Sequence, residues 1–412
     1  MERADENLLP SVYKEVSEAF GAGPADLGYL SFTRNFVRGI SSPLAGVLVI
    51  NYDRSTVLAT GTFFWAFATA AVGASPVNGF GLAIVIPALQ SFIADSYKDA
   101  ARGAGFGFLH LIGHMGGIGG GVLATVMAGH EFWGMPGWRC AFILMATLSA
   151  LIGYFVLLFV VDPRRTDPTT DANNISVASV WMEALKAMKA VVKVKTFRII
   201  VLQGLVGSLP WTSMVFFTLW FQLIGFDHNS TASLLSLFAA GVAMGSFLGG
   251  ALGDRISRVY PNSGRILCAQ FSAFMGIPFT WFLLRVIPQS VSSYYTFAIT
   301  LFLMGLSISW CNTAANNRTM IYAFDRACEG SFSAFAAPMV GILSEKLYGY
   351  NPKSVDPTNG SLPEALALSK GLFTMMAVPF GLCCLFYTPA HWFFRRDRLN
   401  VRMASLKETE LI

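Results

Sequence analysis

The feature that most constrains this chain is a succession of apolar runs, each long enough to form a helix across a lipid bilayer. Such a helix needs about 20 mostly apolar residues. Of the 412 residues, 54% are hydrophobic and only 13% are charged, whereas soluble proteins carry about a quarter charged residues. The runs of sufficient length are 27–50, 56–74, 79–97, 103–129, 137–161, 197–224, 230–253, 265–287, 291–314, 323–347 and 367–394. We therefore predict an all-α polytopic membrane protein with about eleven transmembrane helices.

Basic residues gather in alternate connections between these runs. One set of connections includes Arg54, Arg102, Arg255, Arg318 and the basic residues of 162–198 and 395–407. The other set holds little beyond Lys14, Arg139, Arg285, Lys346 and Lys353. Because cytoplasmic loops carry the excess of Lys and Arg, the first set is predicted to be cytoplasmic. The sequence thus predicts an integral multi-pass protein whose C-terminus is cytoplasmic.

One long connection divides the chain into parts of similar size. Residues 162–196 begin as a polar linker, and the apolar and basic residues after 178 recur at helical spacing. This pattern is typical of an amphipathic helix lying on the inner leaflet. We predict an N-terminal helical bundle at 1–161, a cytoplasmic linker at 162–196, a C-terminal bundle at 197–394 and a cytoplasmic tail at 395–412.

The two predicted bundles share features at matching places. Asp53-Arg54 and Asp254-Arg255 each follow a helix rich in small residues. Glycines four apart form one stripe in each part, comprising Gly113, Gly117 and Gly121 in the first and Gly241, Gly245 and Gly249 in the second. Such stripes let two helices pack closely or slide past each other, and static packing explains them equally well. Duplicated bundles are an architecture of many secondary transporters.

Several motifs resemble the major facilitator superfamily. GGALGDRISR at 249–258 resembles the loop signature between the second and third helices of one half. GHMGGIGGG at 113–121 resembles the glycine-rich fifth helix, and GWR at 137–139 resembles the entry to the sixth. The pattern is most similar to plant and algal members related to Spinster-type carriers. This resemblance covers nearly the whole chain and implies a two-bundle fold that works by alternating access.

The chain departs from this family pattern in two places. The family has twelve helices, and the acidic-Arg pair of its first helix resembles MERADENLLP at 1–10, yet the apolar run before Glu2 is absent. We therefore expect an incomplete first helix. The link 315–322 is shorter than the family's loop and lacks the acidic helix end that would pair with Arg255. The first bundle keeps its counterparts, Asp95 and Arg102.

Charged and polar residues inside the predicted spans are the candidates for proton coupling and for lining a cavity. Charge within the bilayer is costly, so it usually serves a purpose. The candidates are Glu2, Arg3, Asp5, Arg34, Arg38, His110, His114, Gln203 and Trp211. Glu2 best matches a proton-coupling carboxylate, with Arg3 beside it, although a solvated tail is the alternative. Arg34 and Arg38 share a face and could bind an anionic headgroup or a carboxylate. Alternatively, their side chains extend to the membrane interface.

The remaining candidates have equally plain alternatives. His110 and His114 are one turn apart and could respond to protons or join helices by hydrogen bonds. Gln203 and Trp211 could line a cavity for an amphipathic substrate, and core packing explains them as well. A cytoplasmic gate of breakable salt bridges is predicted from Asp53, Arg54, Asp95, Arg102, Asp254, Arg255, Asp325, Arg326 and Glu329.

The motifs of other function classes are absent from the sequence. There is no GxSxG, HExxH or P-loop, and the six cysteines show no CxxC or metal-ligand spacing, so we expect no enzyme, cofactor or metal site. The net charge of +5 is spread among loops, so no nucleic-acid partner is expected. We predict a monomeric, proton-coupled secondary transporter of a small amphipathic or organic-anion molecule. A non-transporting membrane receptor, an assembly partner or an inactive truncated isoform is the alternative.

Overall fold

The computed structural model describes residues 2–33, 35–36, 54–74, 102–159, 195–260, 263–310, 329–352 and 361–410. The predicted run 79–97, the amphipathic helix of the linker and the link 315–322 lie outside these residues. We call residues 2–159 the first half and residues 195–410 the second half. Within the described residues, regular structure is helical except for one short β-hairpin.

The first half begins with two short helices in sequence. Only Val12 separates α1 (Glu2–Ser11) from α2 (Tyr13–Phe20), and Gly21 ends α2 in the left-handed conformation, with φ of 62°. Residues 24–33 are again helical and start at Pro24, whose fixed φ suits a first helical turn. The other elements are α4 (Arg54–Ala74), α6 (Arg102–Ala128), the antiparallel pair β1 (Glu131–Phe132) and β2 (Met135–Pro136), and α7 (Gly137–Phe159).

The second half opens with an interrupted helix where one run, 197–224, was expected. A 3₁₀ turn, η2 (Met214–Phe216), separates α9 (Lys195–Ser213) from α10 (Phe217–Ile224). Pro210 has no N–H to donate to the preceding turn, so the hydrogen-bond ladder is already incomplete in this stretch. Gly225, with φ of 106°, then ends α10.

The rest of the second half is a set of long helices with short irregular turns. They are α11 (His228–Val259), α12 (Gly264–Trp281), η3 (Phe282–Val286), η4 (Val291–Ser293), α13 (Tyr294–Ile308), α16 (Ala336–Ile342), η5 (Leu343–Leu347) and α17 (Leu362–Glu410). α17 exceeds the predicted run 367–394 at both ends, so residues 395–410 of the expected tail are helical.

The described helices confirm the all-α membrane class. Six helical segments are long and apolar enough to cross a bilayer, namely Gly137–Phe159, Val201–Ile224, His228–Val259, Gly264–Val286, Val291–Ile308 and Leu362–Phe393. Many large apolar side chains on the surface are exposed, among them Phe67, Phe159 and Phe247. A soluble protein rarely exposes so much contiguous apolar surface, whereas lipid tails accommodate it. The count of eleven spans stays a prediction.

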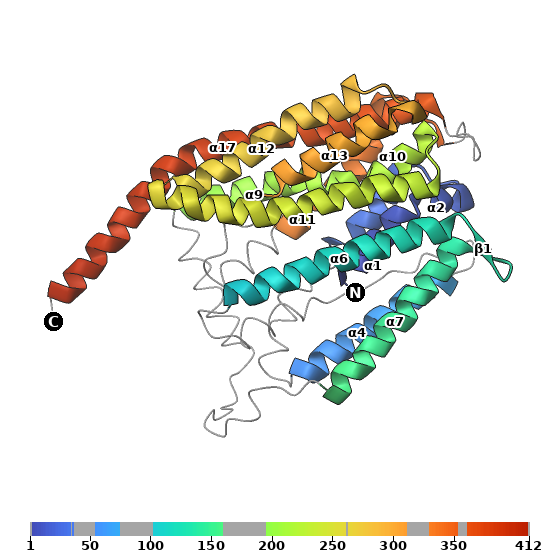
Figure 1. The fold of residues 1–412 in the computed structure, drawn as a ribbon, viewed down its shortest axis with the longest axis horizontal. Helices are drawn as coiled ribbons and strands as arrows, with labels where there is room; N and C mark the ends of the chain where they lie inside the picture. The colour runs from blue at the N-terminus through green and yellow to red at the C-terminus, as the bar shows by residue number, and fades with distance from the viewer. Residues whose placement is uncertain are drawn as a thin grey trace.

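The helices pack in pairs within each half, and helices of the two halves also contact each other (Figure 1). α4 lies along α7, and α6 lies along α1. In the second half α11 packs on α13, while α17 packs on α9 and α12. α6 of the first half also packs on α11 of the second. We call the end of the bundle that carries β1, β2, α2 and α10 the hairpin end.

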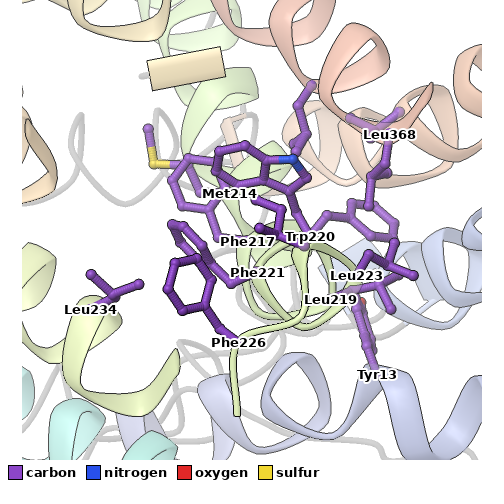
Figure 2. Close-up of a cluster of buried hydrophobic side chains, with 14 of the residues drawn as sticks. Tyr13, Met214, Phe217, Leu219, Trp220, Phe221, Leu223, Phe226, Leu234 and Leu368 are labelled. Atoms are coloured by element: carbon purple, nitrogen blue, oxygen red, sulfur yellow. The ribbon is translucent and has the colours of Figure 1, made fainter. Parts of the chain in front are cut away.

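A cluster of buried hydrophobic side chains, rich in aromatic rings, occupies the hairpin end, and Figure 2 shows part of it. Trp220 and Phe221 each lie within 6 Å of Phe297, with ring centroids 5.7 and 5.4 Å apart, in edge-to-face contact. Tyr13 of α2 reaches Phe216 with its ring 5.3 Å away, so the cluster includes both halves. Edge-to-face aromatic pairs each add about 0.5–1.5 kcal/mol beyond their burial. This cluster fixes α10 against α2 and α13.

We expect Trp220→Ala to destabilise the fold by about 3–5 kcal/mol, as other buried Trp-to-Ala changes do. Trp220 has no exposed surface, and its removal leaves a cavity among the aromatic rings. The thermal unfolding temperature of the purified protein in detergent should fall clearly. Trp281→Ala is the matched control, because Trp281 is 53% exposed on α12 and should matter little. Equal losses in both variants would mean that the cluster does not stabilise this end.

Candidate functional site

The two halves approach each other by their backbones at the hairpin end. The helix 24–33 of the first half lies against α16 of the second. A Cβ atom added to Gly28 would lie 2.6 Å from the Ala337 carbonyl oxygen, and one added to Gly341 would lie 2.4 Å from the Ala25 Cα atom. No side chain fits in these spaces, so glycine allows the contact. The two helices therefore pack as closely as backbones can.

A polar contact accompanies this approach. The Ala25 backbone N–H donates to Glu345 Oε1 of η5 over 2.9 Å. The first N–H groups of a helix have no partner within it, and a carboxylate near a helix N-terminus is favourable. Glu345 of the second half thus caps a helix of the first half. The contact would break if the halves separated at this end.

A buried carboxyl group forms another contact between the halves. Glu15 of α2 is 12% exposed, and neither carboxylate oxygen has a hydrogen-bond partner among the described residues. Glu15 Oε1 lies 3.5 Å from Nδ1 of His228, the first residue of α11. The same nitrogen lies 3.2 Å from Gln222 Nε2 of α10, whose side-chain oxygen is buried without a partner. Glu15 is therefore held between the halves with its polar contacts incomplete.

The groups around Glu15 and His228 influence the protonation of these two side chains. Burial raises the pKa of Glu15, which lies outside the six candidate spans, to about 7, and the Glu18 carboxylate adds to this while Lys14 opposes it. Asp227 caps α11 by accepting from the Ser230 N–H, and its hydrogen bonds with Ser230 lower its pKa. Gly129 at the end of α6 leaves room for the imidazole, because a Cβ there would lie 2.6 Å from His228 Cδ2. Residues of α2, α10 and α11, together with Gly129 after α6, thus form one small polar site.

Two shallow cavities lie near the hairpin end. One, of about 210 Å³, opens between the halves and is lined by Lys14, Ser17, Glu18, Gly21, Leu219, Tyr350 and Pro352. The other, of about 320 Å³, lies between η3 and the start of α17. Gln203 and Trp211, the two candidate cavity residues whose side chains the structure describes, line neither one.

Comparison with known proteins identifies the family. The model of the Major Facilitator Superfamily matches residues 2–344. The chain belongs to the Major Facilitator Superfamily. It is accordingly an integral multi-pass membrane transporter rather than an enzyme. A search of curated proteins found no match.

Solved structures share this major facilitator fold at low sequence identity. A bacterial homologue of the human lysosomal transporter Spinster, inward-facing and unoccupied, matches with TM-score 0.73 and 17% identity over 96% of this chain and 95% of that one. A D-xylose–proton symporter matches with TM-score 0.65 and 13% identity over 94% of each chain. A bacterial homologue of human drug peptide transporters matches with TM-score 0.61 and 13% identity over 96% of each. At these identities the likeness establishes the fold alone, and the predicted two-bundle superfamily fold is confirmed.

For most of the predicted site residues of this superfamily member, the structure does not describe the side chain. Glu2, Arg3 and Asp5 lie in α1, and His110 and His114 lie one turn apart in α6. Arg54 and Arg102 begin α4 and α6, and Asp254 lies in α11. The residues whose backbone also lies outside it are Arg34, Arg38, Asp53, Asp95, Asp325 and Arg326. The roles of all these residues stay predictions.

The remaining candidates have described surroundings. Gln203 Nε2 donates to Cys383 Sγ over 3.3 Å and so joins α9 to α17. Trp211 packs on Phe238, with ring centroids 6.5 Å apart. Glu329 lies against Gly204 of α9, where an added Cβ would meet its carboxylate, and Arg255 is exposed on α11. Gln203 and Trp211 thus have packing contacts, and whether they also line a substrate cavity stays a prediction.

Both glycine stripes lie at helix contacts. Gly117 O accepts a hydrogen bond from Asn7 Nδ2 of α1 over 3.0 Å, and a Cβ on Gly121 would lie 3.4 Å from Asn7 Cβ. In the second half, Gly241, Gly245 and Gly249 face α13 and Trp310 at distances that exclude a Cβ, and Gly113 lies in the same helix as Gly117. Packing that leaves no room for a Cβ is therefore observed along the second stripe, whereas in the first half it occurs at Gly120, where a Cβ would lie 2.4 Å from Ala4 Cβ of α1. Sliding along either contact stays a prediction.

Sequence reasoning missed Glu15 and His228. Helical periodicity places Glu15 seven residues after Leu8 and three after Val12, both of which are buried. This spacing could have marked Glu15 as a carboxylate on an apolar face. His228 had no such signal, because it lies next to a loop and its partners come from distant parts of the chain.

We expect Gly341→Leu to prevent the halves from closing at the hairpin end while leaving the helices intact. In a background without native cysteines, a cysteine at Ser17, which lines the cavity between the halves, should react faster with a water-soluble maleimide. Gly61→Leu is the control, because a Cβ at Gly61 meets no atom within 4 Å. An unchanged labelling rate in Gly341→Leu would show that this contact does not hold the end closed.

Proposed function

We propose that this transporter is a proton-coupled secondary carrier of a small amphipathic or organic-anion molecule and works by alternating access. The observation that supports this most is the contact between the halves at the hairpin end. It combines backbone approach at Gly28 and Gly341, the cap from Glu345 and the Glu15–His228 contact. These contacts would have to form and break as the two halves rock.

The bundles that rock are proposed to be residues 1–161 and 197–394, joined by the linker 162–196 and followed by the tail 395–412. The alternation of basic loops favours a cytoplasmic C-terminus, which puts the hairpin end on the opposite side of the membrane. A closed hairpin end then corresponds to an inward-facing state, the state named for the similar Spinster homologue. The gate residues Asp53, Arg54, Asp95, Arg102, Asp254, Arg255, Asp325, Arg326 and Glu329 would close the cytoplasmic end in the other state.

The proposed driving force and substrate class are inferred from charged residues of the predicted spans. One similar structure is a D-xylose–proton symporter, and Glu2 beside Arg3 in α1 is the carboxylate proposed to carry the proton here. Arg34 and Arg38, with the many aromatic residues, favour a substrate with an anionic group and an apolar part. The transporter is proposed to act as a monomer in the bilayer.

The proposal is tested with the purified chain in sealed liposomes that contain a pH-sensitive dye. Adding a panel of sugars, nucleosides, peptides, lysolipids and organic anions should give proton influx with the true substrate, and an imposed pH gradient should drive accumulation of that substrate. Substrate uptake at the same rate with and without the pH gradient would contradict proton coupling. Binding of a compound without any flux would support the receptor alternative.

We expect Glu2→Gln to block proton-driven uptake but to leave substrate exchange, because exchange needs no net proton movement. Uptake should fall by roughly 10²–10⁴-fold, the range that loss of a positioned proton-transfer group produces. Glu131→Gln, at an exposed residue of β1, is the control. A Glu2→Gln protein with normal pH dependence would exclude Glu2 from the coupling step.

We expect Gly245→Leu to stop transport without preventing expression. An added Cβ at Gly245 would lie 2.2 Å from the Leu306 carbonyl oxygen, so α11 and α13 would have to move apart. Uptake and detergent-solubilised yield are measured together, with Gly61→Leu as control. Normal uptake in Gly245→Leu would mean that movement does not depend on this stripe.

A further inference from the structure

The Glu15–His228 contact links the halves through groups that both bind protons. Glu15 lies in α2 of the first half, and His228 begins α11 of the second. Their closest atoms, Oε1 and Nδ1, are 3.5 Å apart, and α10 covers the pair through Gln222, which is 2% exposed. A carboxylate buried without donors is strongly disfavoured, because nothing replaces the water that it loses. The closed arrangement therefore favours a proton at this position.

The geometry admits two placements of that proton. With Gln222 Nε2 donating to His228 Nδ1, the imidazole nitrogen is unprotonated, and the proton belongs on Glu15. If Nδ1 is protonated instead, it donates to the Glu15 carboxylate, and a turned Gln222 amide presents its unpartnered oxygen to the same proton. In the first placement the proton stays on Glu15, because the single lone pair of Nδ1 already accepts from Gln222. In the second placement the proton lies between Nδ1 and the Glu15 carboxylate.

We propose that Glu15 and His228 form a proton-binding pair between the two halves, which keeps the hairpin end closed while it holds its proton. Loss of the proton leaves a bare buried carboxylate, so water must enter and the halves must separate there. The pair is distinct from Glu2, which lies thirteen residues earlier in the chain. The role of the pair in transport rests on the proposed function, whereas its binding of a proton does not.

Other charged groups around the pair modulate this equilibrium. Lys14 and Glu18 belong to the same helix as Glu15, while Asp227 and His130 act on His228 from the loops before α11 and after α6. Lys14 favours the carboxylate and Glu18 disfavours it. Burial is the largest of these effects on the pKa of Glu15. The pKa of the buried carboxyl in the closed arrangement is higher than that of an exposed carboxyl in the open one. Between these two pKa values, each added pH unit shifts the equilibrium toward the open hairpin end about tenfold.

The first test measures the proton itself in the full-length protein in lipid nanodiscs. Infrared difference spectra across a pH series should show one protonated-carboxyl band that titrates near pH 7. Glu15→Gln should lose this band. Glu18→Gln is the matched control, since Glu18 is one turn away on α2 and is more exposed. His228→Gln should move the midpoint, upward where Nδ1–H donates to the carboxylate and downward where the Nδ1 lone pair faces it.

The outcomes separate this inference from the proposed function. A wild-type protein without a neutral-range carboxyl band, or a band that survives in Glu15→Gln, overturns the proton-binding pair even if transport occurs. A band lost only in Glu15→Gln, in a wild-type protein that moves no substrate or proton, supports the pair and overturns the proposed function. If Glu15→Gln does not fold, the unmoved midpoint of His228→Gln alone overturns the pair.

Discussion

The close approach of helix backbones between the halves is the contact on which the rest of this structure depends. Lipid tails are as apolar as leucine, so moving an apolar side chain from lipid into a helix contact releases little free energy. Helix association in the bilayer therefore depends on close packing and on polar contacts. Gly28 and Gly341 provide that packing at the hairpin end, and the Glu345 cap adds a directional hydrogen bond. Contacts of this kind have a sharp distance limit, so they favour two states over gradual separation.

Two different environments lie side by side at this end of the bundle. The aromatic cluster around Trp220 and Phe297 is fully buried, and it anchors α10 within the second half. The polar site of Glu15, Gln222 and His228 includes one residue of α10, Gln222, and among the described residues it keeps several polar atoms without partners. The buried cluster supports the position of Gln222, while the incomplete polar contacts make this boundary sensitive to protons. The short helix α10 thus contributes both to the buried aromatic cluster and to the proton-sensitive polar site.

Much of the fold could be predicted, because a bilayer permits few solutions. Apolar length located α4, α6 and α7 to within two residues at each end and anticipated the long helices of the second half. The break at η2 and the extension of α17 to Glu410 were not anticipated, because neither changes the apolar pattern within the runs. The glycine stripes were recognised from spacing alone, and their partners, α1 and α13, were found only in the structure.

The sequence by itself determined the class, the family resemblance and the apolar spans, since these follow from local composition, periodicity and short motifs. Only the tertiary structure decided which residues meet across the halves. Glu15 and His228 are separated by more than two hundred residues, and neither belongs to a motif. The cost of burying a carboxylate depends on what surrounds it in space. That information arises when the helices pack, so no local pattern could contain it.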